Sequence, residues 1–194
     1  MRVLDLIGYN RTDIGKGASK ALRREGSVPC VMYGGEEGNV HFHTPMILFR
    51  DIVYTPEVAF VNMDIEGKEY KCILQDIQFH PVSEIILHAD FLRLFDDVPV
   101  VMEVPVKFVG TSPGLQKGGK LSTTLRKIKV KALPGNMPSA VEVSLEGLEL
   151  GQSAKVKSIN AEGYEILNGG NVTIASITIP RALRSAQTKG EGEE

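Results

Sequence analysis

Residues 75–91, QDIQFHPVSEIILHADF, carry the clearest structural signal in the chain. Polar and apolar side chains alternate at both ends of this stretch, and residues two apart in a β-strand share a face. The alternation places Gln78 with His80 on one face of a first strand. It places His88 with Asp90 on one face of a second strand. The stretch therefore predicts two half-buried strands whose outer faces are polar.

Further strand-like runs fill the rest of the N-terminal half. They occupy residues 3–9, 29–33, 40–43, 58–65, 69–79 and 85–94. Glu66-Gly67-Lys68 predicts a hairpin turn. Residues 46–54 predict a short helix that ends before Pro56, because the residue preceding a proline disfavours helical backbone. The N-terminal half is therefore expected to be mainly β.

The C-terminal half consists almost entirely of predicted strands and turns. Strands are expected at residues 100–109, 126–133, 140–145 and 172–179, separated by turns that contain Gly and Pro. This spacing is typical of a β-sheet or β-sandwich domain. We therefore predict a mainly β protein with a few short helices, divided into residues 1–94, residues 95–182 and a polar, disordered tail at 183–194.

The composition of the chain excludes several classes of protein. The chain has 194 residues, of which 42% are hydrophobic and 24% are charged, so it can form a folded core. No apolar run is long enough for a membrane-spanning helix. Asp5 interrupts the apolar start, which argues against a secretory signal. Cys30 and Cys72 form no CxxC pair, which fits buried thiols in a reducing cytoplasm and argues against a structural zinc site.

The total charge is not that of a basic nucleic-acid-binding protein. The net charge is −2, from 22 Lys and Arg against 24 Asp and Glu. Residues 1–94 hold 10 basic and 13 acidic side chains, a net of −3, and residues 95–194 hold 12 and 11, a net of +1. Because binding follows the local field and not the total, any anion site is expected to be a local patch.

Residues 11–24 form one such patch, with five cations against one acid. A helix is expected at residues 19–25, ended by Gly26. If it begins by Lys16, the turn of about 100° per residue puts Lys16, Lys20 and Arg23 on one face. The opposite, apolar face holds Ala18, Ala21 and Leu22. Glycines on both sides of Lys16 permit close approach of a phosphate; the alternative is a solvated helix face, and the spacing does not match a P-loop.

Polar side chains on the predicted strands offer a second candidate site. An exposed His88 and Asp90 pair can ligate a metal, carry out acid–base chemistry, or hydrogen-bond the sugar hydroxyls and base edges of RNA. The alternative is that the two side chains only pair with each other or with the backbone. No nucleophile or complete ligand set accompanies them, and His41 and His43 on another strand do not by themselves make a metal site.

Two other features carry weaker signals. Tyr33 ends a strand before two glycines, where it can stack on a nucleotide or stand half-buried at a barrel rim. Lys127, Lys129 and Lys131 share one face of a predicted strand. That face can contact phosphate, or it can simply keep the sheet soluble and unpaired.

The order and spacing of these motifs resemble the bacterial large-subunit ribosomal protein twenty-five family, in its two-domain branch, the general stress protein CTC branch. The N-terminal resemblance spans residues 1 to about 94. It rests on Arg11, Gly15-Lys16-Gly17-Ala18-Ser19, Leu22-Arg23, Pro29-Cys30-Val31-Met32-Tyr33-Gly34, residues 75–81 and residues 88–91. The C-terminal resemblance rests on residues 114–121, Leu133-Pro134, Met137-Pro138 and Leu148-Glu149-Leu150-Gly151.

The resemblance implies a β-barrel-like N-terminal domain that binds the minor groove of an internal loop of 5S ribosomal RNA, followed by a C-terminal β domain. The RNA-binding residues implied by position are Arg11, Lys16, Ser19, Lys20, Arg23, Tyr33, Gln78, His88 and Asp90. The cations would neutralise phosphates, and His88 and Asp90 would contact 2′-hydroxyls and base edges. The chain departs from the family at Ala21, where a second basic residue is frequent, and at Cys30, where alanine is usual.

The leading hypothesis is a non-catalytic structural constituent of the large ribosomal subunit that binds 5S rRNA and helps form the central protuberance. The expected partners are 5S rRNA, large-subunit proteins and 23S rRNA, with no cofactor, metal, membrane or small-molecule substrate. The expected location is the cytoplasm, on the ribosome. One alternative is a metal-dependent hydrolase that uses His80, His88 and Asp90. Another is a stress-related protein-interaction module that acts through the C-terminal domain.

Overall fold

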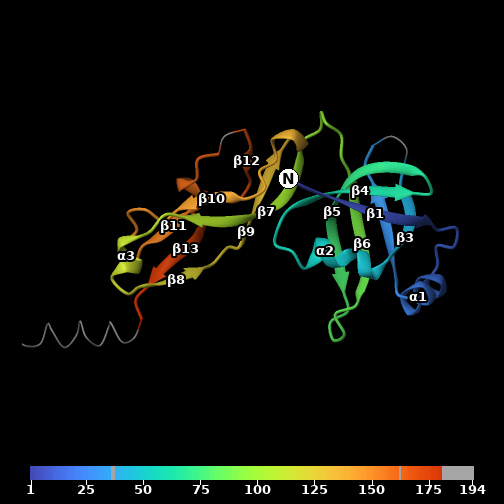
Figure 1. Cartoon of the computed structure of the whole chain (residues 1–194), viewed down its shortest axis with the longest axis horizontal. Coiled ribbons are helices and arrows are strands. Elements are labelled where there is room, and N and C mark those ends of the chain that lie inside the picture. Colours follow the sequence, from blue (N-terminus) through green and yellow to red (C-terminus); the bar gives the residue numbers. More distant parts are fainter. Residues whose placement is uncertain (36–37, 162, 181–194) are drawn as a thin grey trace, which may run out of the picture. The chain divides into compact units, whose positions relative to one another are not determined.

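The computed structural model describes residues 1–35, 38–161 and 163–180 (Figure 1). The tail predicted at residues 183–194 lies outside this part of the chain. The chain forms two compact units. The N-terminal unit consists of Met1–Met102 with Ala132–Ser139, and the C-terminal unit consists of Glu103–Lys131 with the described residues from Ala140 onward.

Six strands of the N-terminal unit close into a barrel, in the cyclic order β1-β3-β2-β6-β5-β4. The strands are β1 (Arg2–Asn10), β2 (Ser27–Tyr33), β3 (Val40–Pro45), β4 (Ala59–Ile65), β5 (Lys68–Phe79) and β6 (Ile86–Arg93). Parallel pairing of β1 with β4 closes the ring, so that neither strand is left with an unpaired edge. The prediction of a mainly β, barrel-like N-terminal domain is confirmed.

The barrel interior is filled by the apolar side chains of the alternating strands. Phe42 and Phe91 are fully buried, with ring centroids 5.8 Å apart. Phe49 packs against Phe91 at 6.2 Å. It comes from the 3-10 turn η1 (Met46–Phe49), which continues into the short helix α2 (Arg50–Val53). The helix predicted at residues 46–54 is therefore two consecutive short turns that supply one aromatic side chain to the core.

The two cysteines lie in the same core. Cys30 and Cys72 are both free and fully buried, and the Cys30 Sγ donates to the Val28 carbonyl oxygen at 3.3 Å. Burial raises the pKa of Cys72 to about 12 and raises the pKa of Cys30 well above its usual range. Because only the thiolate is a strong nucleophile, both residues act as small apolar side chains of the barrel.

The turn between β4 and β5 forms where the sequence predicts it. Glu66 and Gly67 both adopt positive φ, at 52° and 85°, which matches the twist of the two strands that the turn joins. Asp64 Oδ1 accepts a hydrogen bond from the Gly67 N–H at 2.8 Å. The turn thereby fixes the register of β5, which carries Gln78 at its far end.

Phe79 ends β5 and stands partly in solvent, with 40% of its surface exposed. Alternation in residues 75–91 puts it on the same face as Ile77, and the strand pairing agrees. Ile77 lies opposite Ala89 and Phe79 lies opposite Ile86, and both partners are buried. The pairing of β5 with β6 shifts register between Leu74 and Asp76 and again between Gln78 and Phe79.

The C-terminal unit contains two small sheets, which confirms the predicted second β domain. Strands β10-β7-β9-β12 form one sheet and β11-β13-β8 form the other. Their bounds are β7 (Val100–Val109), β8 (Lys120–Thr123), β9 (Lys127–Ala132), β10 (Val141–Ser144), β11 (Ser153–Lys155), β12 (Glu165–Ile166) and β13 (Thr173–Thr178), with the short turns α3 (Pro113–Gln116) and η3 (Val156–Ser158). The turn η2 (Pro134–Asn136) belongs to the segment Ala132–Ser139 of the N-terminal unit. Strands β8, β11 and β12 are too short to show a period, which is why the sequence did not predict them.

Strand β9 has the two faces that its sequence predicts. Ile128 and Val130 are fully buried, while Lys127, Lys129 and Lys131 are exposed. Acidic side chains share the outer surface of this sheet, because Glu165 pairs with Lys131 and Glu142 pairs with Lys107. This mixture of signs is typical of a solvated sheet face.

Truncation of Phe91 to alanine is expected to destabilise the fold by about 3–5 kcal/mol, because the side chain is fully buried between two other aromatic rings. Chemical denaturation of the full chain measures the change. Phe79→Ala is the matched control. It should cost less than about 1 kcal/mol, since Phe79 stands partly in solvent. Equal losses for the two variants would contradict the burial described here.

Candidate nucleic-acid interface

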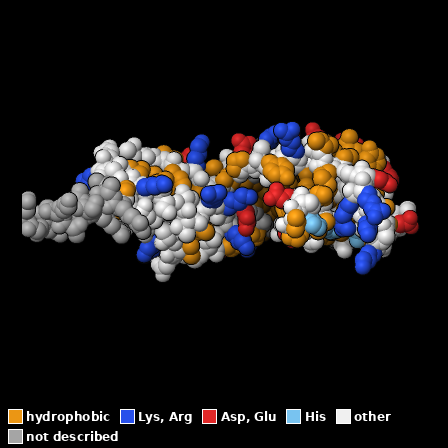
Figure 2. All heavy atoms as spheres, turned by 90° about the horizontal axis from the view of Figure 1, so that it is seen from below, with side chains coloured by type: hydrophobic (Ala, Val, Ile, Leu, Met, Phe, Trp, Pro, Cys, Tyr) orange, Lys and Arg blue, Asp and Glu red, His pale blue; other side chains and the backbone are white. Residues whose placement is uncertain are grey.

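The helix α1 (Lys16–Arg24) presents a row of cations beside the barrel. Lys16, Lys20 and Arg24 are exposed, and Arg23 is half-buried. Figure 2 shows Lys and Arg side chains gathered over this end of the N-terminal unit, with His side chains next to them. The apolar side of the helix is buried less than predicted, because Ala21 is exposed and no residue of α1 is fully buried.

Little within the helix itself holds α1 in place. Its N-cap is Gly15, which offers no side-chain cap, and its first turn contains no acid to offset the helix dipole. Arg11 supplies one tie, because its Nη2 donates to Ser19 Oγ at 3.0 Å and to the Asp13 carbonyl oxygen at 3.2 Å. Two predicted binding residues, Arg11 and Ser19, are therefore in direct contact with each other.

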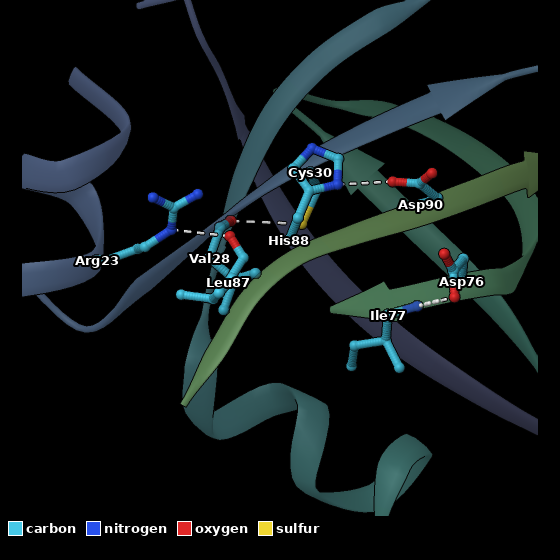
Figure 3. Close-up of polar contacts among 8 residues, drawn as sticks. All are labelled: Arg23, Val28, Cys30, Asp76, Ile77, Leu87, His88 and Asp90. Atoms are coloured by element: carbon cyan, nitrogen blue, oxygen red, sulfur yellow. Dashed lines mark hydrogen bonds and ion pairs between the residues drawn. The ribbon is translucent and has the colours of Figure 1, made fainter. Parts of the chain in front are cut away.

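Arg23 supplies the second tie and joins the helix to the sheet. Its Nε donates a hydrogen bond of 2.8 Å to the carbonyl oxygen of Leu87 on β6 (Figure 3). Leu87 directly precedes His88, so this bond places the cationic helix next to the polar face predicted from residues 75–91. The two patches, 64 residues apart in the sequence, become one surface.

The outer face of β5 and β6 carries the remaining polar residues. Gln78 lies opposite His88, and Asp76 lies opposite Asp90. His88 Nδ1 and Asp90 Oδ1 are 2.6 Å apart, with 30% and 28% of their side chains exposed. Asp90 therefore holds the imidazole in one orientation (Figure 3), and both side chains remain accessible from outside. The two side chains pair with each other and also remain exposed, so their pairing leaves both accessible to a ligand.

Tyr33 lies at the end of β2, close to these carboxylates. Burial raises its pKa above the usual tyrosine range, and the negative charges of Asp90 and Asp76 raise it further. Asp76 was not among the predicted residues, although it stands two positions before Gln78. Its Oδ1 accepts from the Ile77 N–H at 2.9 Å at the register shift in β5. Sequence alternation alone could have assigned Asp76 to the same face.

Two more histidines flank this surface. His41 lies opposite Val31, which in turn lies opposite Asp90, so β3 continues the row of outward side chains. His43 stacks near Tyr9, with ring centroids 5.4 Å apart. Burial lowers the pKa of His43, and the charge of Arg11 lowers it further, against an opposing effect of Glu25. These surroundings therefore favour the neutral form of the His43 imidazole.

The side chain of His80 forms hydrogen bonds with the backbone of its own loop. Its Nδ1 accepts from the N–H groups of Val82 and Ser83, at 3.4 and 3.2 Å. Within the described residues, no group of three or more His, Cys, Asp or Glu side chains is placed to hold a metal ion. The ligand set of His80, His88 and Asp90, which the hydrolase alternative requires, is not assembled in this part of the chain.

Three acidic side chains of the barrel belong to strands or turns away from the cationic helix. In the cyclic strand order, β6 lies three strands from β1, and β2 lies three strands from β4. Asp5 belongs to β1, Asp64 belongs to β4, and Glu66 lies in the turn after β4. The negative total of residues 1–94 therefore coexists with a basic surface at α1.

Two protein-family models match the chain, one in each half. Residues 6–91 match the family model described as the Ribosomal L25p family, and residues 99–181 match the model for the C-terminal domain of ribosomal protein TL5. The described helices include none that is long and apolar enough to span a membrane.

Individual relatives resemble the chain over nearly its whole length. A protein of Cytophaga hutchinsonii named large ribosomal subunit protein bL25 is 47% identical over 187 residues, which cover 96% of this chain and 97% of the relative. Proteins of the same name from Amoebophilus asiaticus and Porphyromonas gingivalis are 46% and 40% identical, covering 100% and 97% of this chain and 98% and 99% of their own.

The barrel, the basic helix and the two matched models define the class of this protein, which is a two-domain ribosomal protein. Within that class, the chain belongs to the Ribosomal L25p family.

Replacement of Asp90 by asparagine is expected to lower the pKa of Tyr33, because the change removes a negative charge that disfavours the tyrosinate. Since the folded-state pKa is the higher one, ionisation of Tyr33 destabilises the fold as pH rises past the usual tyrosine range, and this loss should shrink in the variant. NMR titration of ring-labelled tyrosine resolves the residue. Asp64→Asn serves as the control, and an unchanged Tyr33 curve in Asp90→Asn would contradict the proximity.

Proposed function

We propose that the chain is a structural constituent of the large ribosomal subunit that binds 5S rRNA and helps form the central protuberance. The names of its relatives support the subunit. The binding surface consists of α1, its entry loop and the outer face of β5 and β6. It is formed by Arg11, Lys16, Ser19, Lys20, Arg23, Tyr33, Gln78, His88 and Asp90.

The hydrogen bond from Arg23 to Leu87 is the observation that carries this proposal. It brings a row of cations and a row of polar side chains to adjacent positions, and RNA recognition needs both. Cations neutralise phosphates and set the position of the protein on the RNA. The polar side chains then contact 2′-hydroxyls and base edges in a wide, shallow minor groove.

The two carboxylates of the polar face influence which part of the RNA can lie over that face. Asp76 and Asp90 lie opposite each other, and an ionised carboxylate only accepts hydrogen bonds. They repel phosphates and attract amino and hydroxyl groups. RNA is therefore expected to place its backbone over α1 and its groove edges over β5 and β6, while His88, oriented by Asp90 through Nδ1, presents its other ring nitrogen to the RNA.

The wider context follows from the same assignment. We place the protein on cytoplasmic ribosomes, with large-subunit proteins and 23S rRNA near the central protuberance as its further neighbours. Its role is structural and not catalytic. Residues 1–94 form the 5S rRNA-binding domain in this proposal, and residues 95–182 form the C-terminal β domain.

Gel-shift titration of the full chain with isolated 5S rRNA at several salt concentrations tests the cations. Lys20→Ala is expected to weaken binding and to reduce the salt slope by about one, because one phosphate contact is lost. Arg23→Ala should weaken binding more than Lys20→Ala does, since it also removes the bond to Leu87. Lys68→Ala, at the start of β5, is the matched control and should bind as the wild type does.

The polar face is tested in the same titration. His88→Ala is expected to weaken binding about tenfold, because a groove contact is worth about 1–3 kcal/mol, with the salt slope unchanged. The proposal fails if Arg23→Ala and His88→Ala both bind 5S rRNA as tightly as the wild type.

A further inference from the structure

The connection between β5 and β6 exposes apolar side chains beside the proposed RNA surface. It extends beyond the body of the barrel (Figure 1). Phe79, Val82 and Ile85 are 40%, 86% and 42% exposed, and we call these three residues the apolar tip. Several exposed apolar side chains on one short connection are typical of an interaction site, whereas single exposed ones are ordinary.

The backbone of this connection is already ordered by its own hydrogen bonds. The His80 N–H donates to the Ile85 carbonyl oxygen at 2.8 Å, and the Glu84 N–H donates to the His80 carbonyl oxygen at 3.0 Å. The imidazole of His80 accepts from the next two N–H groups along the chain. A preorganised loop loses little conformational entropy on binding. The apolar tip can therefore bind a partner at a low entropic cost.

The charges of the connection favour a protein partner over RNA. Residues 79–92 contain no Lys or Arg, and Glu84 is the only charged residue between Phe79 and His88. RNA affinity depends mainly on cations that neutralise phosphates, and the connection offers none. An exposed valine beside a carboxylate instead fits an apolar pocket with positive charge at its rim.

The position of the connection agrees with this assignment. Gln78 and His88, opposite each other on β5 and β6, are the last residues of the polar face before the chain enters the connection. RNA bound over that face would therefore leave the apolar tip at the edge of the RNA contact, available to a neighbour.

We propose that the apolar tip docks into an apolar pocket on a neighbouring protein of the large subunit, with a basic side chain of that protein beside Glu84. This inference rests on the proposed function, because it needs the chain to sit in the subunit. It adds a protein contact that the RNA-binding residues do not include.

Val82→Asp in the full chain separates the two contacts. It is expected to bind isolated 5S rRNA as the wild type does. It is expected to bind large subunits stripped of this protein about tenfold more weakly, because a charge replaces a valine that the docking contact would bury. Val172→Asp, at an exposed valine of the C-terminal unit, is the matched control and should match the wild type in both assays. Thermal melting verifies that both variants fold.

Val82→Cys with a thiol-directed photo-crosslinker identifies the neighbour, since both native cysteines are buried. The expected product in reassembled subunits is a crosslink to a protein. A crosslink to RNA alone, undiminished subunit binding by Val82→Asp, or an equal loss of Val82→Asp binding to isolated 5S rRNA would each overturn the docking proposal. Failure of the wild-type chain to bind 5S rRNA would instead overturn the proposed function.

Discussion

Closure of the six-stranded barrel is the constraint on which the rest of the structure depends. Parallel pairing of β1 with β4 removes the free edges and fixes an inside and an outside for every strand. Phe42, Phe91 and both cysteines then fill the interior. The same alternation forces His88 and Asp90 outward on β6. Burial of the core and display of the polar face are therefore two results of one geometry.

Part of the negative charge lies on the far side of this barrel, which helps an acidic chain to carry a local row of cations. The cations of α1 stand beside β2 and β6, while Asp5 and Asp64 belong to strands on the opposite side of the ring. The field near α1 is set by the nearest charges, because salt screens those more than about 8–10 Å away. Net charge alone argues against nucleic acid, whereas the local row of cations on α1 is compatible with it.

The helix α1 shows how a functional element differs from a structural one. It buries no residue fully and lacks an N-cap side chain, and hydrogen bonds from Arg11 and Arg23 help to hold it. Both arginines also belong to the proposed RNA surface. The side chains that hold the helix are thus expected to be sensitive to the RNA, whereas the barrel core is not. The apolar tip differs from α1, because hydrogen bonds of its own backbone order it and it carries no cation.

The sequence by itself determined the longer strands, the turn at Glu66 and Gly67, and the cationic face of α1, because each depends on local periodicity or on turn chemistry. It also placed His88 and Asp90 on one face. Tertiary structure alone decided that Arg23 meets Leu87 and that Asp76 lies opposite Asp90. These depend on strand neighbours and on bulges, which are set by barrel closure and long-range packing and leave no local pattern in the chain.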